Sequence, residues 1–124
     1  MNEKKQTVVV LGASSKQNRY SNRAVRSLLK EGYKVFPVNP KESSIEGLPV
    51  FASLTDITDP VETVSVYLSP EHLEKELPRL LELKPKRVIL NPGTANHAII
   101  QTLSDSDITV IEDCTLILLS SGEF

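Results

Sequence analysis

The stretch VVVLGASSKQNRYSN, residues 8–22, decides the fold of this chain. Its apolar start belongs to the β-branched run Thr7–Leu11, which is typical of a central strand buried on both faces. Gly12 then predicts a tight turn, and Ser21 can cap a helix whose apolar residues within 24–29 share one face. Strand, glycine turn and helix together indicate the start of an α/β nucleotide-binding domain.

Short β-rich runs and helical segments alternate along the rest of the chain, which predicts a parallel sheet. After the first strand, four more strands are predicted at 33–38, 63–68, 87–90 and 108–111. The run at 63–68 alternates in polarity, and we interpret it as an edge strand with one wetter face. The last apolar run, 116–119, is either a short sixth strand or a segment that packs on the sheet or on a second subunit.

Local signals mark the other turns and helix starts. Ser69-Pro70-Glu71 is typical of a helix start, with a serine cap and a proline at the first helical position. Pro78 lies inside this helical pattern, where a proline costs about 3 kcal/mol, so we expect a kink or a break there. A short capped turn is predicted at 53–57. The glycine turn NPGT, residues 91–94, should be followed by a helix over 95–103.

These elements predict a single α/β domain over residues 1–124, a three-layer, Rossmann-like, doubly wound parallel sheet of five strands in the order 3-2-1-4-5. In that order strands one and four are neighbours where the winding reverses, and ligands of such sheets bind there. Gly12 and Gly93 follow these two strands and would face each other across the crevice. Glycine lets a ligand approach the backbone, and free amides at a helix start attract anions. The alternative for either turn is a tight strand-to-helix connection without a ligand.

Composition excludes several classes of function. The chain has 124 residues, a net charge of −2 and no block of like charge, so nucleic acid is not an expected partner. No signal-peptide pattern and no apolar run of roughly 20 residues is present, so we expect a cytoplasmic protein that does not enter the membrane. The single cysteine, Cys114, allows no internal disulfide and argues against a metal site.

The first turn departs from the dinucleotide fingerprint G-x-G-x-x-G. Ser14 and Gln17 stand where the second and third glycines would be, so a standard NAD fit is not expected. NAD enzymes also place an acid after the second strand, whereas Lys41 follows Asn39-Pro40 here. A lysine at this place favours a phosphate on the ribose, and the alternative is a solvated side chain.

The motifs of the whole chain resemble a known family. They are, in order, VVVLGASS, RYSNRAV, GYKVFPVNPKE, GLPVF, VSVYLSPEH, PKRVILNPGT and EDCTL. The series is similar to the small stand-alone CoA-binding proteins of Rossmann type and to the CoA-binding domain of the succinyl-CoA synthetase alpha chain. The resemblance spans nearly the whole chain. It implies coenzyme A or an acyl-CoA as the ligand.

The resemblance also implies which group of CoA each segment would meet. The diphosphate would lie along the first glycine turn and the helix start, at Gly12, Ala13, Ser14, Ser15, Arg19, Tyr20 and Ser21. The 3'-phosphate would meet the segment after the second strand, Asn39, Pro40 and Lys41. The adenine or ribose would be flanked by the end of the third strand, Tyr67 and Leu68. The opposite wall and the pantetheine path would be lined by Asn91, Pro92 and Gly93.

No residue is assigned a catalytic role. His72 is predicted to be a surface residue in the first turn of a helix, and no carboxylate at a defined spacing orients His97. Cys114 follows Glu112 and Asp113, two acids that oppose formation of the thiolate that a nucleophile needs. The histidine that carries phosphate in the synthetase lies in a further domain, so thioester-forming chemistry is not expected here.

Three hypotheses follow from these observations. The first is a module that binds CoA or an acyl-CoA without catalytic machinery, as a monomer or a homodimer. The second is an NADP-binding protein or oxidoreductase-like module, in which Lys41 would meet the 2'-phosphate. The third is an interaction scaffold whose nucleotide site has been lost. In the first, the partner is a small-molecule CoA ligand, and no metal is required.

Overall fold

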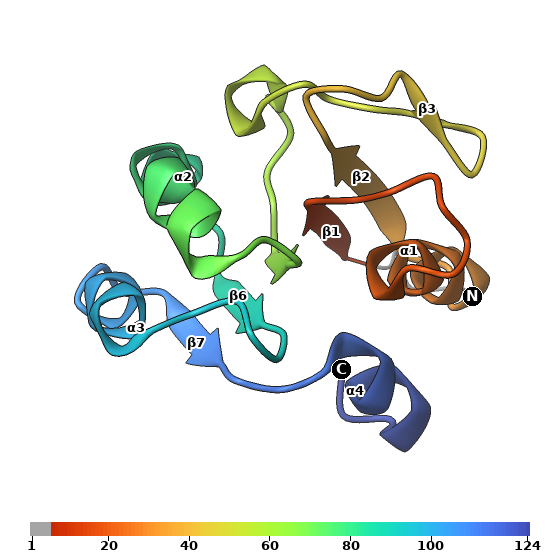
Figure 1. Cartoon of the computed structure of the whole chain (residues 1–124). Helices are drawn as coiled ribbons and strands as arrows, with labels where there is room; N and C mark the ends of the chain where they lie inside the picture. Colours follow the sequence, from red (N-terminus) through yellow and green to blue (C-terminus); the bar gives the residue numbers. More distant parts are fainter. Residues whose placement is uncertain (1–5) are drawn as a thin grey trace.

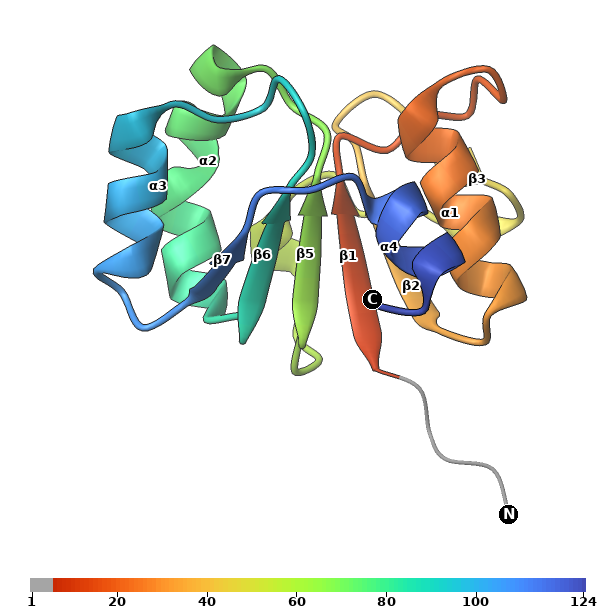
Figure 2. The same cartoon turned by 90° about the horizontal axis from the view of Figure 1, so that it is seen from below.

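A five-stranded parallel sheet forms the middle layer of the structure, a computed structural model that describes residues 6–124. Its strands are β1 (Thr7–Leu11), β2 (Lys34–Val38), β5 (Thr63–Val66), β6 (Arg87–Leu90) and β7 (Thr109–Ile111). Figures 1 and 2 show a pair of helices on each face. One pair is α1 (Tyr20–Lys30) and α4 (Thr115–Ser121), and the other is α2 (Pro70–Leu83) and α3 (His97–Ser104). The predicted three-layer α/β class is confirmed.

The connection from β2 to β5 contains no α-helix. It consists of a small hairpin of β3 (Ser44–Ile45) and β4 (Leu48–Pro49), followed by the 3-10 turn η1 (Leu54–Asp56). Ser53 caps that turn by accepting a hydrogen bond from the Thr55 amide, as its sequence predicts. The chain thereby returns from the β2 edge to the middle of the sheet (Figure 1).

The strand order differs from the predicted 3-2-1-4-5. Along the sheet the order is β2-β1-β5-β6-β7, which is 2-1-3-4-5 when the five strands are counted along the chain. The connection from β1 to β2 passes over one face of the sheet through α1, and the connection from β2 to β5 passes over the other face through η1. Because crossovers between parallel strands are right-handed, this change of face places β5 on the opposite side of β1 from β2. The predicted order was therefore wrong. Gly12 and Gly93 follow strands that β5 separates.

β5 is a central strand rather than an edge strand. All four of its residues are buried. The hydroxyl groups of its polar residues have partners: Thr63 Oγ1 accepts a hydrogen bond from Arg87 Nε at 2.7 Å, and Ser65 Oγ lies 2.7 Å from Thr115 Oγ1. The prediction of a wetter face was wrong because small hydroxyl side chains can be buried once other side chains satisfy them.

The last apolar run forms helix α4, so within residues 6–124 the main sheet has five strands and not a sixth. Leu118 is buried, and Leu119 packs against a core cluster that includes Val8 and Val10 of β1. The predicted alternative in which this run packs on the sheet is confirmed. Its chain end turns back at Gly122, which adopts the left-handed conformation (φ 79°) after the helix.

Helix boundaries follow local sequence signals with small shifts. α2 begins at Pro70 after Ser69, as predicted, although the Ser69 side chain makes no capping hydrogen bond. The helix continues through Pro78, so the break that we expected as one alternative does not occur. α1 begins at Tyr20, so Ser21 lies inside the helix instead of capping it. α3 begins at His97, two residues later than predicted.

The sheet buries both faces. Val9 and Leu11 pack with the α2 and α3 side, whereas Val8 and Val10 pack with the α1 side. This arrangement explains the continuous apolar run of β1, since a parallel strand covered on both sides has no polar face. Within residues 6–124 no helix has the length and apolar character needed to cross a bilayer.

Candidate functional site

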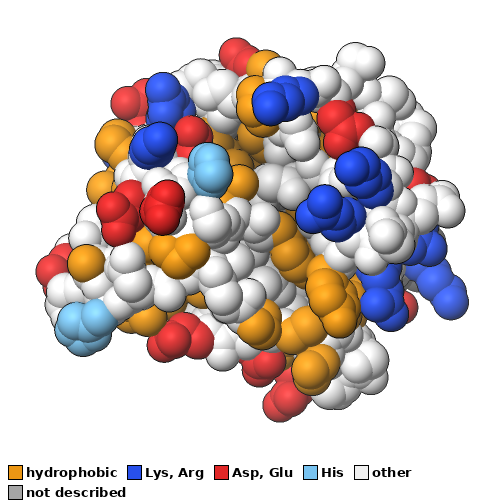
Figure 3. Space-filling view, viewed as in Figure 1, with side chains coloured by type: hydrophobic (Ala, Val, Ile, Leu, Met, Phe, Trp, Pro, Cys, Tyr) orange, Lys and Arg blue, Asp and Glu red, His pale blue; other side chains and the backbone are white. Residues whose placement is uncertain are grey.

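The carboxyl ends of the strands lie level at one edge of the sheet. Leu11 is paired with Val38 on one side and with Val66 on the other, and Val66 is paired with Leu90. In a sheet of this order the winding reverses between β1 and β5, and ligands of doubly wound sheets bind at such a point. Figure 3 shows the molecule from this edge. The candidate site is therefore built from the segments that follow these strands.

The glycine turn after β1 is fixed by the fold itself. Gly12 has a φ of 89°, and the amides of Gly12 and Ala13 both donate to Val38 O at 3.1 Å. A Cβ at position 12 would lie 2.9 Å from Tyr67 O and 2.9 Å from Leu68 Cδ2. Only glycine fits this backbone without strain. Since Val38 uses the first two amides, a ligand phosphate would have to meet the later part of the turn.

The later part of the turn is held by two carboxylates from the hairpin region. The Ser15 amide donates to Glu42 Oε2 at 3.0 Å, and hydrogen bonds from the Ser15 side chain and backbone lower the pKa of Glu42. Glu46 Oε2 accepts hydrogen bonds from Asn22 at 3.1 Å and from Gln17 at 3.4 Å. The Glu42 carboxylate therefore accepts a hydrogen bond from the Ser15 amide, which could otherwise donate to an anionic ligand.

Asn39 connects the ends of β1 and β2. Its Nδ2 donates to Ala13 O at 2.8 Å, and its Oδ1 accepts from the Lys41 amide at 2.7 Å. The Lys41 side chain is exposed and forms no ion pair within the described part of the chain. This lysine therefore has a fixed backbone and a free ammonium group.

A pocket lies beside Gly12, between the ends of β1 and β2 and helix α2. We call it the β1–α2 pocket, and its volume is about 300 Å³. It is lined by Leu11, Gly12, Val38, Pro40, Ala52, Ser53, Leu68, His72, Lys75, Glu76 and Arg79. The strand ends supply apolar side chains, and α2 supplies a polar rim. Three of the predicted site residues, Gly12, Pro40 and Leu68, come together here.

His72, predicted to be a surface residue, is exposed and lines the rim of the β1–α2 pocket. Its Nδ1 lies 2.7 Å from Ser69 Oγ, so the ring is oriented by the residue that precedes the helix. His97 is also exposed, at the first position of α3.

A second pocket lies at the end of β6, and we call it the β6–α4 pocket. Its volume is about 290 Å³, and its lining residues are Leu90, Asn91, Pro92, Gly93, Ala95, Glu112, Asp113, Cys114 and Ile117. The predicted residues Asn91, Pro92 and Gly93 therefore lie together, apart from Gly12. Neighbouring strands are about 4.8 Å apart, so the ends of β1 and β6 are separated by roughly 10 Å.

The Asn91 side chain is fully engaged within the protein. Its Nδ2 donates to Ser65 Oγ at 3.0 Å and to Val66 O at 2.8 Å, and its Oδ1 accepts from the Thr115 amide at 2.8 Å. Asn91 thereby ties the start of α4 to the ends of β5 and β6. Pro92 and Gly93 are exposed, so they are the members of this turn that a ligand can reach.

Tyr67 and Leu68 point to opposite faces of the sheet. Leu68 lines the β1–α2 pocket, whereas Tyr67 packs with the core cluster on the α1 side. The Tyr67 hydroxyl is buried and has no hydrogen-bond partner among the described residues. Burial raises the pKa of Tyr67 to about 12. Only Leu68 of this pair reaches the pocket.

The residues predicted around the start of α1 differ in exposure. Arg19 and Tyr20 are exposed, and the Arg23 guanidinium lies 5.4 Å from the centre of the Tyr20 ring. Ser21 is buried. Arg19 and Tyr20 are thus accessible at the carboxyl edge, while Ser21 belongs to the helix packing.

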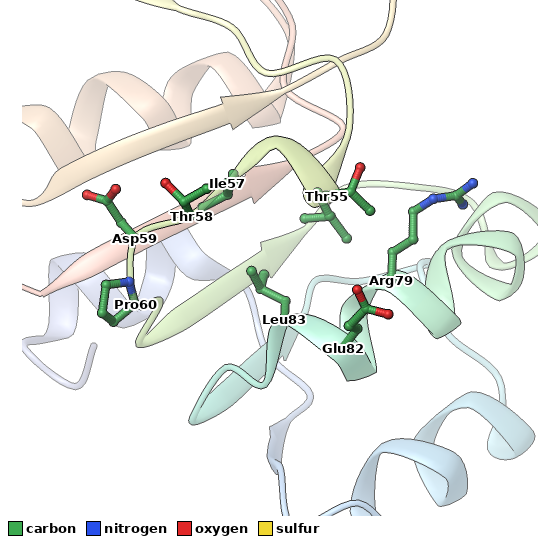
Figure 4. A pocket seen from close by; sticks show the side chains of 9 residues that line it. Thr55, Ile57, Thr58, Asp59, Pro60, Arg79, Glu82 and Leu83 are labelled. Carbon is green, nitrogen blue, oxygen red and sulfur yellow. The ribbon is translucent and has the colours of Figure 1, made fainter.

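A further pocket separates η1 and the segment after it from α2. Figure 4 shows Thr55, Ile57 and Thr58 on one wall and Arg79 and Glu82 on the other. It contains none of the predicted site residues. Within residues 6–124 no group of three or more His, Cys, Asp or Glu side chains is arranged to hold a metal ion.

Sequence reasoning missed the residues that brace the site. Glu42 and Glu46 stand in a polar loop without a motif, and Ser65 and Thr115 are far apart in the sequence. Only the contact between the segments shows their role. For Asn22 the sequence does contain a weak signal: it is a polar residue on the buried face of a helix, and such a residue requires a hydrogen-bond partner.

Comparison with known proteins gives the same architecture. The chain is 27% identical over 111 residues to the uncharacterized protein YneT of Bacillus subtilis (strain 168), covering 90% of this chain and 82% of the relative. The structure of cell-free ID.343 from Thermus thermophilus is similar with a TM-score of 0.89 and 32% identity, over 97% of this chain and 91% of that one.

A larger enzyme contains the same fold. The dinucleotide-forming acetyl-coenzyme A synthetase 1 of Ca. Korarchaeum cryptofilum, in complex with phosphate and ADP, is similar with a TM-score of 0.77 and 18% identity. The likeness covers 87% of this chain and 25% of that chain, and at this identity it concerns the fold alone. The family described as "CoA binding domain" matches residues 6–120. The chain therefore belongs to the CoA binding domain family.

Proposed function

We propose that this protein binds coenzyme A or an acyl-CoA across the carboxyl edge of its sheet, without catalytic machinery of its own. The observation that carries the proposal is the β1–α2 pocket beside Gly12, next to a lysine whose ammonium group is free. The family to which the chain belongs supports CoA as the ligand class.

The adenosine part of the ligand would occupy the β1–α2 pocket. Leu11, Val38 and Leu68 offer an apolar surface for a flat ring. Pro40 also lines the pocket and directly precedes Lys41 in the chain. A volume of about 300 Å³ is at the lower end of the range for small-molecule sites. The rest of CoA would therefore extend along the edge of the sheet.

The phosphates would use the two segments that Asn39 joins. Lys41 would meet the 3'-phosphate as an unpaired cation. The diphosphate would approach Ser14 and Ser15, because the Gly12 and Ala13 amides already donate to Val38 O. To reach the Ser15 amide it would have to replace the Glu42 carboxylate.

The pantetheine arm would cross the end of β5 toward Pro92 and Gly93. The separation of roughly 10 Å between the ends of β1 and β6 is shorter than the extended arm. The thiol or thioester would then lie at the β6–α4 pocket, where Cys114 is part of the lining.

Three observations support a role in binding rather than catalysis. His72 is oriented by Ser69 and not by a carboxylate, and His97 lies outside both pockets of the site. Cys114 stands beside two acids on the pocket wall. None of these arrangements contains a nucleophile in hydrogen-bond contact with a base that a third group orients.

Calorimetry with CoA, 3'-dephospho-CoA, NADP and NAD tests the proposal. CoA should bind most tightly, and loss of the 3'-phosphate should weaken binding. Tighter binding of NADP would favour a nicotinamide ligand, because Lys41 could then meet the 2'-phosphate. If none of the four ligands binds, the proposal fails.

A further inference from the structure

The β6–α4 pocket combines an apolar wall with two carboxylates. Leu90, Pro92, Ala95 and Ile117 supply the apolar side chains, and Ile117 is 58% exposed although it is a large aliphatic residue. Glu112 and Asp113 line the same pocket at the end of β7. The pocket can therefore make apolar contacts with an aliphatic group, and its two carboxylates would repel a negatively charged group.

The negative charge of this pocket is not compensated locally. No Lys or Arg is among its lining residues within 6–124. In the described part of the chain the Glu112 side chain has neither a hydrogen bond nor an ion pair. Asp113 Oδ1 accepts a hydrogen bond from the Cys114 amide at 2.7 Å. Figure 3 shows acidic and hydrophobic side chains over the lower part of this face, where β7 and α4 lie, and Lys and Arg over the upper and right parts.

The two ends of the candidate site therefore differ in charge. The end near Lys41 favours phosphate, whereas the end near Glu112 and Asp113 disfavours any anion. If CoA lies as proposed above, its thioester end reaches this acidic end, so the inference rests on the proposed function.

We infer that the β6–α4 pocket selects CoA thioesters whose acyl group is an uncharged aliphatic chain, and that Glu112 and Asp113 discriminate against acyl groups ending in a carboxylate. The apolar side chains would cover the aliphatic chain. A terminal carboxylate would lie near two like charges, and such repulsion lowers affinity by about three- to tenfold at a partly exposed site.

Butyryl-CoA and succinyl-CoA form a matched pair of probes, because their acyl groups have the same number of carbons and differ by a terminal carboxylate. Calorimetry with the full chain at low ionic strength should show succinyl-CoA binding about three- to tenfold more weakly than butyryl-CoA. In about 1 M salt the difference should shrink, since exposed charges are then screened.

The double variant Glu112→Gln, Asp113→Asn tests the two carboxylates directly. Asn at position 113 keeps an oxygen that can accept the Cys114 amide, so the start of α4 retains its contact. The difference between the two thioesters should fall to within about twofold. Glu82→Gln is the control, because Glu82 is an exposed acid near the carboxyl end of α2 and lies outside the β6–α4 pocket. It should leave the difference unchanged.

The outcomes separate this inference from the proposed function. Absence of binding by CoA and by both thioesters overturns both. Binding of CoA with equal affinities for the two thioesters, or with tighter binding of succinyl-CoA, overturns only the selection of uncharged acyl groups. A wild-type difference that survives in the folded double variant, with an unchanged melting temperature, overturns the assignment to Glu112 and Asp113.

Discussion

Gly12 lies so close to Tyr67 that a Cβ built on the glycine would be 2.9 Å from the Tyr67 carbonyl oxygen. This contact joins the ends of β1 and β5, the two strands between which the winding of the sheet reverses. The glycine is therefore required by strand packing before any ligand is considered. Its mutation should be tested first as a change in stability.

Gly12→Ala should lower the free energy of unfolding by about 2–4 kcal/mol. The positive φ of 89° contributes about 1–2 kcal/mol of strain for a residue with a Cβ, and overpacking contributes the rest. Gly47→Ala is the matched control, because Gly47 also has a positive φ but a Cβ there would meet nothing within 4 Å. Urea denaturation measures both. Equal losses in the two variants would contradict a tight contact at Tyr67.

Lys41→Glu should cost about 1.5–3 kcal/mol of CoA binding, the scale of a charge-assisted hydrogen bond. The loss should be much smaller for 3'-dephospho-CoA, because that ligand lacks the phosphate that Lys41 would meet. Lys30→Glu applies the same charge change at an exposed position in the last turn of α1, and it should leave CoA affinity unchanged. Calorimetry compares the wild type and the two variants, each with CoA and with 3'-dephospho-CoA. Equal losses for CoA and its dephospho form would place the 3'-phosphate elsewhere.

Glu42→Gln should increase CoA affinity by about two- to tenfold, because it removes a carboxylate that competes with phosphate for the Ser15 amide. Hydrogen bonds from Ser15 lower the pKa of Glu42, so the competing charge is present throughout the neutral range. For the same reason, the stability that this contact contributes is present above the usual carboxyl pKa and is lost as the pH falls through the lowered value. Weaker CoA binding by the variant would show instead that Glu42 holds the turn in its binding shape.

Local signals were sufficient to predict most elements of the fold. The β-branched run before Gly12 predicted a buried strand, and Ser69-Pro70 marked the start of α2 correctly. The strand order depends on which face of the sheet the chain crosses between β2 and β5, and the segment 39–62 contains no α-helix that would indicate that face. The polar residues Thr63 and Ser65 then suggested an edge strand, although their hydroxyl groups have partners from distant segments.

The candidate site shows the same limit. The two glycine turns could be recognised from sequence, and each contributes to a pocket at the carboxyl edge. Asn91 also belongs to such a turn, but its amide is used by Ser65, Val66 and Thr115. A motif identifies residues that can bind a ligand, whereas the tertiary contacts determine which of their polar groups remain free.

Tyr67→Phe should change how stability depends on pH. Burial raises the pKa of Tyr67 from 10.0 to about 12, so the folded state keeps a proton that the unfolded chain loses. In the wild-type protein, the contribution of the protonated Tyr67 hydroxyl to the free energy of unfolding should be fully present below about pH 10 and should be lost as the pH rises toward 12. Near pH 11 the loss is about 1 kcal/mol of the free energy of unfolding.

The phenylalanine variant should lack this alkaline loss. Near neutral pH it should be as stable as the wild type or more stable by about 1 kcal/mol, because it removes a buried hydroxyl that has no hydrogen-bond partner among the described residues. Tyr20→Phe is the control, because it removes the same hydroxyl group from a residue that is 64% exposed. Denaturant titrations near pH 7 and pH 11 compare the three proteins. The same alkaline loss in Tyr67→Phe as in the wild type would assign the titration to another group.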